Sequence, residues 1–148
     1  MKKLEDLIQR LHTVASERLE HEELERDFQL LLAQAKSVQG LRQLAEEYTP
    51  HPEISVPLYL RLLELTPDDA DSVAELGFVF WLSGEDEKAK EQAIRALRIA
   101  PANVKALLLQ AALEPDLHAK GVLYRQVLEC DPRNQVALAN LRELTLKS

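Results

Sequence analysis

The chain has 148 residues, 25 Asp and Glu against 18 Lys and Arg, a formal net charge of -7 and a single cysteine. This length is typical of one domain with a continuous core, and the abundance of helix formers beside scarce Gly and aromatic residues favours an all-α protein. The excess of acidic residues argues against nucleic-acid binding, because that needs clustered Lys and Arg. The lack of long apolar runs and of a signal-peptide pattern argues against a membrane or secreted protein. The single cysteine excludes an intramolecular disulfide.

Residues 1–36 contain no Gly or Pro and carry two apolar stripes at helical spacing. The stripes consist of Leu4, Leu7, Ile8, Leu11 and Ala15, and of Leu24, Phe28, Leu31, Leu32 and Ala35. Because the stripes are out of phase by about one residue, we expect two helices, roughly 2–18 and 21–36, joined at His21-Glu22-Glu23. One long bent helix is the alternative. Gly40 then interrupts the pattern, and a short helix is expected over 41–48, ended by Thr49-Pro50.

Prolines punctuate the remainder of the chain. A helix marked by Leu58, Leu62, Leu63 and Leu65 closes at Thr66-Pro67. Pro57 is expected in its first turns, where a missing N–H is tolerated. Pro67 and Pro101 are 34 residues apart, whereas Pro132 follows Pro101 by only 31. The shorter spacing predicts that the first helix after Pro101 ends about one turn early. Residues 135–146 predict a closing helix.

The stretch 70–103 resembles the tetratricopeptide repeat (TPR) in its period and in its small and apolar residues. Counted from Ala70 as position 1, the matching residues are Leu76 at 7, Gly77 at 8, Phe80 at 11, Gly84 at 15, Ala89 at 20, Ala96 at 27 and Pro101 at 32. In this interpretation Leu76 and Phe80 fill the seam between two helices, and Gly77 and Ala89 lie where those helices cross closely.

The resemblance implies an all-α fold, a right-handed α-solenoid of about three TPR-like helical hairpins with N-terminal helices and a C-terminal capping helix. We expect residues 1–36 to pack as amphipathic helices on repeats that occupy 37–148. Within that range 37–69 is degenerate, 70–103 near-consensus, 104–134 shortened and 135–148 the capping helix.

The resemblance also implies a concave groove lined by the first helices of the repeats. The predicted partner-binding residues are Asp71, Ala74, Phe78, Trp81, Leu82, Lys105 and Leu108. Phe78 and Trp81 could instead be covered by the helices of 1–36, or form a homodimer seam. TPR domains that grip a chaperone's C-terminal carboxylate use Lys, Asn and Arg at groove positions. Here Ala74, Glu75 and Phe78 stand at those positions, so a clamp of this kind is not expected.

No sequence motif points to catalysis, a cofactor or a metal. The four histidines, His12, His21, His51 and His118, are scattered without metal-ligand spacing, and no pattern pairs Cys130 with a base. The sequence therefore predicts a cytoplasmic, non-catalytic interaction module that binds a peptide or helix of a partner protein, without nucleic acid or membrane. The alternative is a structural protein that self-assembles into a homo-oligomer through its N-terminal helices or apolar groove.

Overall fold

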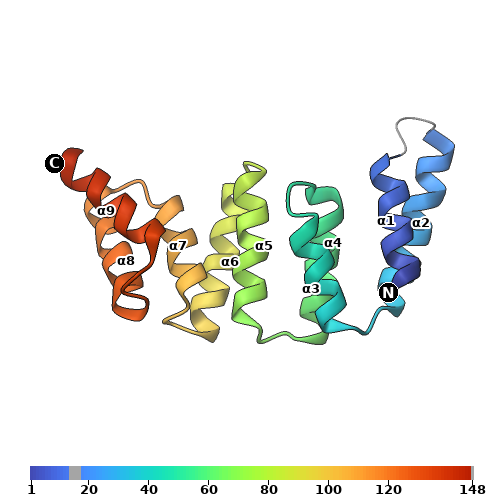
Figure 1. Cartoon of the computed structure of the whole chain (residues 1–148), viewed down its shortest axis with the longest axis horizontal. Coiled ribbons are helices and arrows are strands. Elements are labelled where there is room, and N and C mark those ends of the chain that lie inside the picture. The colour runs from blue at the N-terminus through green and yellow to red at the C-terminus, as the bar shows by residue number, and fades with distance from the viewer. Residues whose placement is uncertain (14–17, 148) are drawn as a thin grey trace. The chain divides into compact units, whose positions relative to one another are not determined.

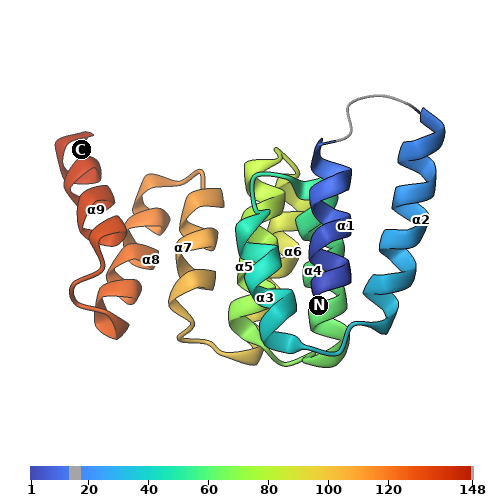
Figure 2. The same ribbon diagram turned by 45° about the vertical axis from the view of Figure 1, so that its right-hand side comes forward.

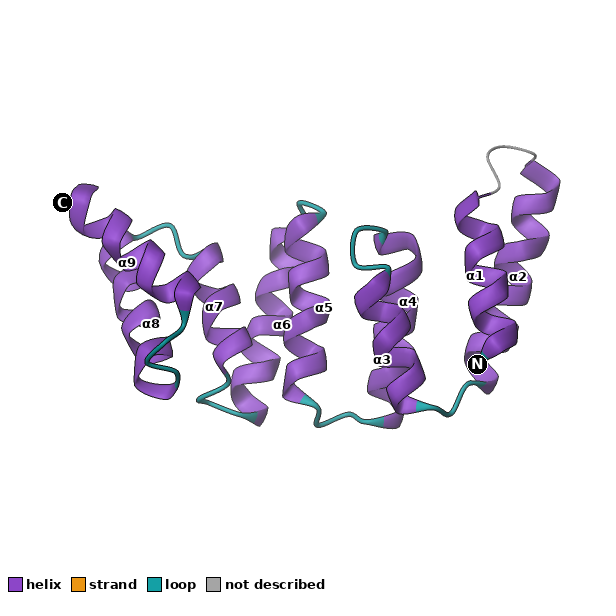
Figure 3. Ribbon diagram, viewed as in Figure 1, coloured by secondary structure: helices purple, strands orange, loops and turns teal. Residues whose placement is uncertain are grey.

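The computed structural model describes residues 1–13 and 18–147, and every regular element within them is a helix (Figures 1 and 3). The predicted all-α fold of sequential helical hairpins is confirmed. The helices are α1 (Lys2–Thr13), α2 (Arg18–Gln34), α3 (Val38–Glu47), α4 (Pro52–Leu65), α5 (Ala70–Leu82), α6 (Asp86–Ile99), α7 (Val104–Leu113), α8 (Leu117–Cys130) and α9 (Gln135–Lys147).

The chain divides into two compact units, Met1–Pro67 and Asp68–Ser148. The first unit contains two hairpins, α1–α2 and α3–α4. Its core is built from the predicted stripes, because the same residues that recur at helical spacing are those removed from water. Buried members of these stripes include Leu4, Ile8, Leu24, Phe28 and Leu32, and the core also contains Leu41 and Leu44 of α3 and Leu58 and Leu62 of α4. Ala15, the last residue of the first predicted stripe, lies outside the described residues.

A single arginine ties the two hairpins of the first unit together. Arg61 on α4 donates from Nε and Nη2 to the carbonyl oxygen of Ala35, at 3.1 and 3.0 Å. Its Nη1 also donates to Glu64 at 2.7 Å. The Ala35 carbonyl follows the last turn of α2, where carbonyl groups lack partners inside the helix. Arg61 therefore supplies an end cap for α2 from a neighbouring helix.

Three predicted boundaries in the first unit are wrong. The join expected at His21-Glu22-Glu23 lies inside α2. These residues are exposed there, and polar side chains on an exposed helix surface do not interrupt a helix. Gly40 does not precede α3 but lies within it, because Ser37 caps the helix by accepting from the Gly40 N–H at 3.1 Å. Pro52 occupies the start of α4, which places Pro57 in the helix interior.

The second unit begins with the α5–α6 hairpin, whose helices cross closely at Gly77. A Cβ added to Gly77 would collide with Leu109 Cδ2 of α7 and would lie 3.1 Å from Gln92 Cβ of α6. Ala89, Ala93 and Ala96 are buried on the facing side of α6. Small residues at these positions let the helices approach, as the repeat pattern predicts.

The α7–α8 hairpin follows, and α9 packs against α8 (Figure 2). Buried Leu107, Ala111, Tyr124, Val127 and Ala137 join these three helices in one cluster. Burial raises the pKa of the Tyr124 hydroxyl, and the nearby Glu143 carboxylate raises it further. The prediction that the first helix after Pro101 ends about one turn early is confirmed, since α7 has 10 residues and α5 has 13. In the described part of the chain, no helix has the length and apolar character to cross a membrane.

Candidate functional site

The most exposed aromatic surface of the second unit lies at the end of α5. Trp81 is 38% exposed and Leu82 is 64% exposed, while Phe78 is half-buried. The Phe78 and Trp81 rings meet edge to face, with centroids 6.2 Å apart and an interplanar angle of 78°. This geometry is one that aromatic pairs favour, so each ring restricts the other while leaving apolar surface open.

Local sequence fixes both ends of α5. Asp69 caps the helix by accepting from the Ser72 N–H at 3.2 Å and from its hydroxyl at 2.8 Å. The helix ends at Leu82, after which Gly84 adopts a φ of 78° that other residues rarely tolerate. The aromatic pair is thus held on a helix with defined termini.

Two polar contacts join the first half of α5 to the start of α7. The Asn103 side chain donates from Nδ2 to Asp71 Oδ1 at 2.7 Å, and its Oδ1 caps α7 by accepting from the Ala106 N–H at 2.9 Å. Lys105 forms an ion pair with Glu75. These contacts bring the starts of the two helices together. From its start, α7 is three residues shorter than α5, with 10 residues against 13. The last turn of α5, with Trp81 and Leu82, therefore extends beyond its neighbour.

We call this surface the α5–α7 face and define it by six side chains. They are Asp71, Glu75, Phe78, Trp81, Leu82 and Lys105. Asp71, Glu75, Phe78 and Leu82 recur at intervals of three or four residues, and Trp81 follows Phe78 by three, which places them on one side of the helix. Two of the sequence-predicted residues contribute differently. Ala74 is completely buried, and Leu108 is half-buried and packs against the cluster of α7, α8 and α9.

The α5–α7 face has no arrangement that would grip a carboxylate. Within the ranges of α5 and α7 the single Lys or Arg is Lys105, and Glu75 already neutralises it. The other groove positions hold aliphatic, aromatic or acidic residues. The face can exclude water around an apolar side chain and can accept hydrogen bonds at Asp71.

Sequence reasoning missed two features that depend on tertiary structure. In the first unit His12, Tyr48 and His51 gather, with the two imidazole centroids 4.2 Å apart and Glu53 Oε1 3.7 Å from His51 Nδ1. No group of three or more metal-binding side chains occurs in the described residues, however. The second feature is an open pocket between α6 and the end of α7. It is lined by Lys90, Ala93, Ile94, Gln110, Leu113, Glu114 and Pro115.

Known structures share this fold. The first TPR of Spaghetti (RPAP3), bound to the HSP90 peptide SRMEEVD, superposes with a TM-score of 0.68 at 16% identity, covering 74% of this chain and 94% of that one. The Arabidopsis OM64 TPR domain superposes with a TM-score of 0.63 at 17% identity, covering 72% and 93%. No protein-family model and no curated protein matches the sequence. The TPR fold predicted from the sequence is confirmed.

Proposed function

We propose that the chain is a non-catalytic protein–protein interaction module and that it binds a peptide or helix of a partner protein on the α5–α7 face. The observation that supports this most directly is the exposure of Trp81 and Leu82 beside Phe78. Trp is the residue type most enriched among side chains that dominate binding energy. An apolar surface placed at the end of a rigid helix is suited to an anchor side chain of a ligand.

The structural relatives are consistent with this proposal. One of them is bound to an HSP90 peptide. Our chain carries no cations at the α5–α7 face that could hold such a peptide's carboxylates, because Lys105 is paired with Glu75. We therefore infer that apolar contacts anchor the ligand here.

Affinity capture from a cell lysate, with the chain immobilised, tests the proposal. Trp81→Ala removes the central ring, and Val122→Ala is the matched control, since Val122 is 39% exposed on α8. We expect the control to retain the same bound protein as wild type and Trp81→Ala to lose it, with circular dichroism unchanged in both. Truncation of a central Trp weakens binding by about 2 kcal/mol or more. Equal retention by all three chains would contradict the proposal.

The self-assembly alternative predicts a different measurement. Sedimentation velocity over a range of concentrations would then show a mass that rises with concentration in wild type and in the control variant. Trp81→Ala would lose this rise if the apolar groove is the contact and keep it if the N-terminal helices are. An interaction module that takes a separate partner keeps one mass throughout.

A further inference from the structure

The α5–α7 face joins an apolar end to an acidic end. Residues 68–87 contain seven Asp or Glu and no Lys or Arg. Of these carboxylates, Asp71 and Glu75 lie on the same side of α5 as Phe78. A ligand that lies along α5 would therefore contact aromatic rings at one end and carboxylates at the other.

The two carboxylates differ in what neutralises them. Glu75 is paired with the Lys105 ammonium group, so its charge is balanced within the unit. Asp71 is exposed and bonds to the Asn103 side-chain amide, which is neutral. The amide holds the carboxylate in a fixed position without cancelling its charge. Asp71 is thus a pre-oriented acceptor with an available negative charge.

The spacing between the charge and the aromatic pair is set by the helix. Asp71 and Phe78 are seven residues apart, which corresponds to roughly 10 Å along α5. In an extended ligand this distance spans about three residues, and in a helical ligand about seven. A ligand of either form can therefore reach both points within a short segment.

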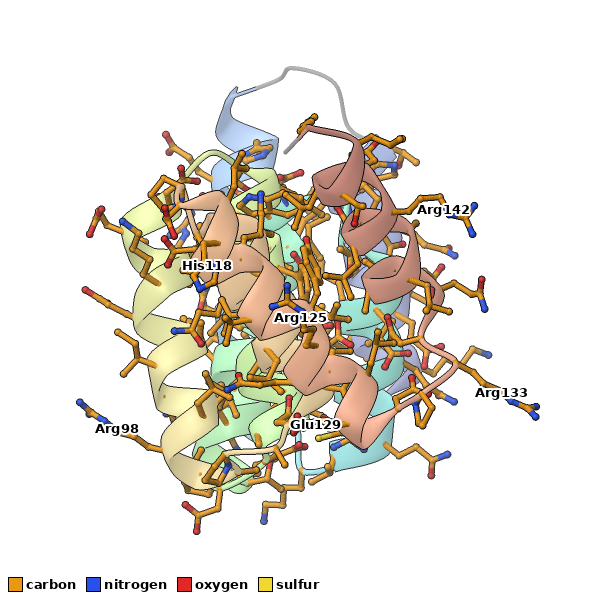
Figure 4. The ribbon with its side chains drawn as sticks, turned by 90° about the vertical axis from the view of Figure 1, so that its left-hand side faces the viewer. Arg98, His118, Arg125, Glu129, Arg133 and Arg142 are labelled. Atoms are coloured by element: carbon orange, nitrogen blue, oxygen red, sulfur yellow. The ribbon has the colours of Figure 1, made fainter. Side chains whose placement is uncertain are left out.

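The cations of the second unit lie on other helices. Arg98 on α6, Arg133 after α8 and Arg142 on α9 extend away from the ribbon, and Arg125 lies on the outer face of α8 (Figure 4). Residues 117–148 contain five Lys or Arg and three Asp or Glu, the reverse of the balance around α5. The cations that contact α5 come from neighbouring helices. Lys105 is paired with Glu75, and the Lys88 ammonium group lies 5.4 Å from the Phe80 ring centroid and is paired with Glu85.

Building on the proposed function, we propose that the ligand of the α5–α7 face is a cationic, amphipathic segment of a partner protein. Its apolar side chain packs on Phe78 and Trp81, and a Lys or Arg pairs with Asp71. Charge complementarity across an interface fixes orientation and rejects wrong partners. The face therefore selects against acidic tails and orients the segment with its basic residue toward the start of α5.

A random library of displayed peptides about 12 residues long tests this proposal, because such peptides are long enough to span α5 when extended. The full-length chain is the bait in three forms: wild type, Asp71→Lys, and Glu91→Lys as the control. Glu91 is exposed on α6, so its replacement makes the same change in net charge away from the face. A fourth bait, Trp81→Ala, reports whether the selected peptides use the aromatic pair.

We expect wild type and Glu91→Lys to enrich peptides with an apolar residue and a nearby Lys or Arg. We expect Asp71→Lys to enrich Asp or Glu at the same spacing. For one selected peptide and its Lys→Glu counterpart, emission of the only tryptophan gives the affinities. Asp71→Lys should weaken the basic peptide about fivefold or more, as expected for reversal of an exposed ion pair, and less so at high salt.

The contrary outcomes separate this inference from the function it builds on. Trp81-dependent peptides without a basic preference, or with an acidic one, would overturn the cationic ligand and leave the interaction module standing. Peptides that bind Trp81→Ala as well as wild type would overturn both. If Asp71→Lys instead removes an association of the chain with itself, the occupant is a second copy, and a partner segment is refuted.

Discussion

The close crossing at Gly77 makes a quantitative prediction from a pair of matched glycines. Gly77 and Gly121 both lie in helix interiors and are both buried. A Cβ on Gly77 would meet Leu109 Cδ2 and Gln92 Cβ, whereas a Cβ on Gly121 would meet only the Arg125 side chain, at an ordinary 3.5 Å. Gly→Ala in a helix interior gains about 1 kcal/mol from lower backbone entropy in the unfolded chain.

That gain is common to both substitutions, so their difference isolates the crowding at Gly77. Overpacking a close contact costs about 1–3 kcal/mol, and Gln92 Cβ cannot retreat without moving the α6 backbone. We expect Gly121→Ala to stabilise the second unit by about 0.5–1 kcal/mol and Gly77→Ala to be neutral or destabilising by up to about 2 kcal/mol. For a unit of this size, each kcal/mol shifts Tm by about 4–8 °C.

Thermal unfolding followed by circular dichroism measures the shift in Tm, and hydrogen exchange in α5 and α6 assigns it to the second unit. Leu109→Ala provides a further control, because it removes the side chain that the new methyl group meets. The cost of Gly77→Ala should fall in that background, giving a coupling free energy of about 1 kcal/mol. If Gly77→Ala stabilises the chain as much as Gly121→Ala does, the assigned crossing is refuted.

Two more substitutions test contacts outside the crossing. Arg61→Met keeps the aliphatic stem but removes the hydrogen bonds to the Ala35 carbonyl. Amide hydrogen exchange at the end of α2 should therefore become faster by a factor that corresponds to about 1.5–3 kcal/mol. Unchanged protection would show that this cap does not stabilise α2. The pKa of Tyr124 in the folded chain is raised above 10.0, so ionisation of its hydroxyl favours unfolding. The stability that the protonated hydroxyl contributes is present below pH 10 and is lost as the pH rises through the folded pKa. Tyr124→Phe should therefore flatten the loss of stability above pH 10, and an unaltered pH profile would contradict that assignment.

Much of the fold follows from patterns that are local in the sequence. Apolar residues at helical spacing mark the buried sides of the helices, and the repeat positions of Leu76, Phe80 and Ala96 are buried in the structure. The proline spacing predicted the short α7. These features depend on the helical period and on chain length between breakers, which a sequence displays directly. The division of the chain into N-terminal helices over 1–36 and repeats over 37–148 stays a prediction.

Helix ends were less predictable where a cap decided between alternatives. Ser37 begins α3 with its side-chain oxygen accepting from the Gly40 N–H, which places the glycine inside the helix. His21-Glu22-Glu23 lie on an exposed side of α2, where charge is compatible with an uninterrupted helix. Composition alone does not distinguish a charged surface from a helix break.

The chemistry of the α5–α7 face was decided by tertiary structure. The sequence alone determined that α5 would carry Phe78, Trp81 and Leu82 among acidic residues, because helical periodicity and composition are written in the order of the side chains. It could not determine that Asn103 would bond to Asp71 or that Lys105 would pair with Glu75, since these partners are 32 and 30 residues apart. Which charge is neutralised depends on how two helices pack, and only the packed structure fixes the distances between their side chains.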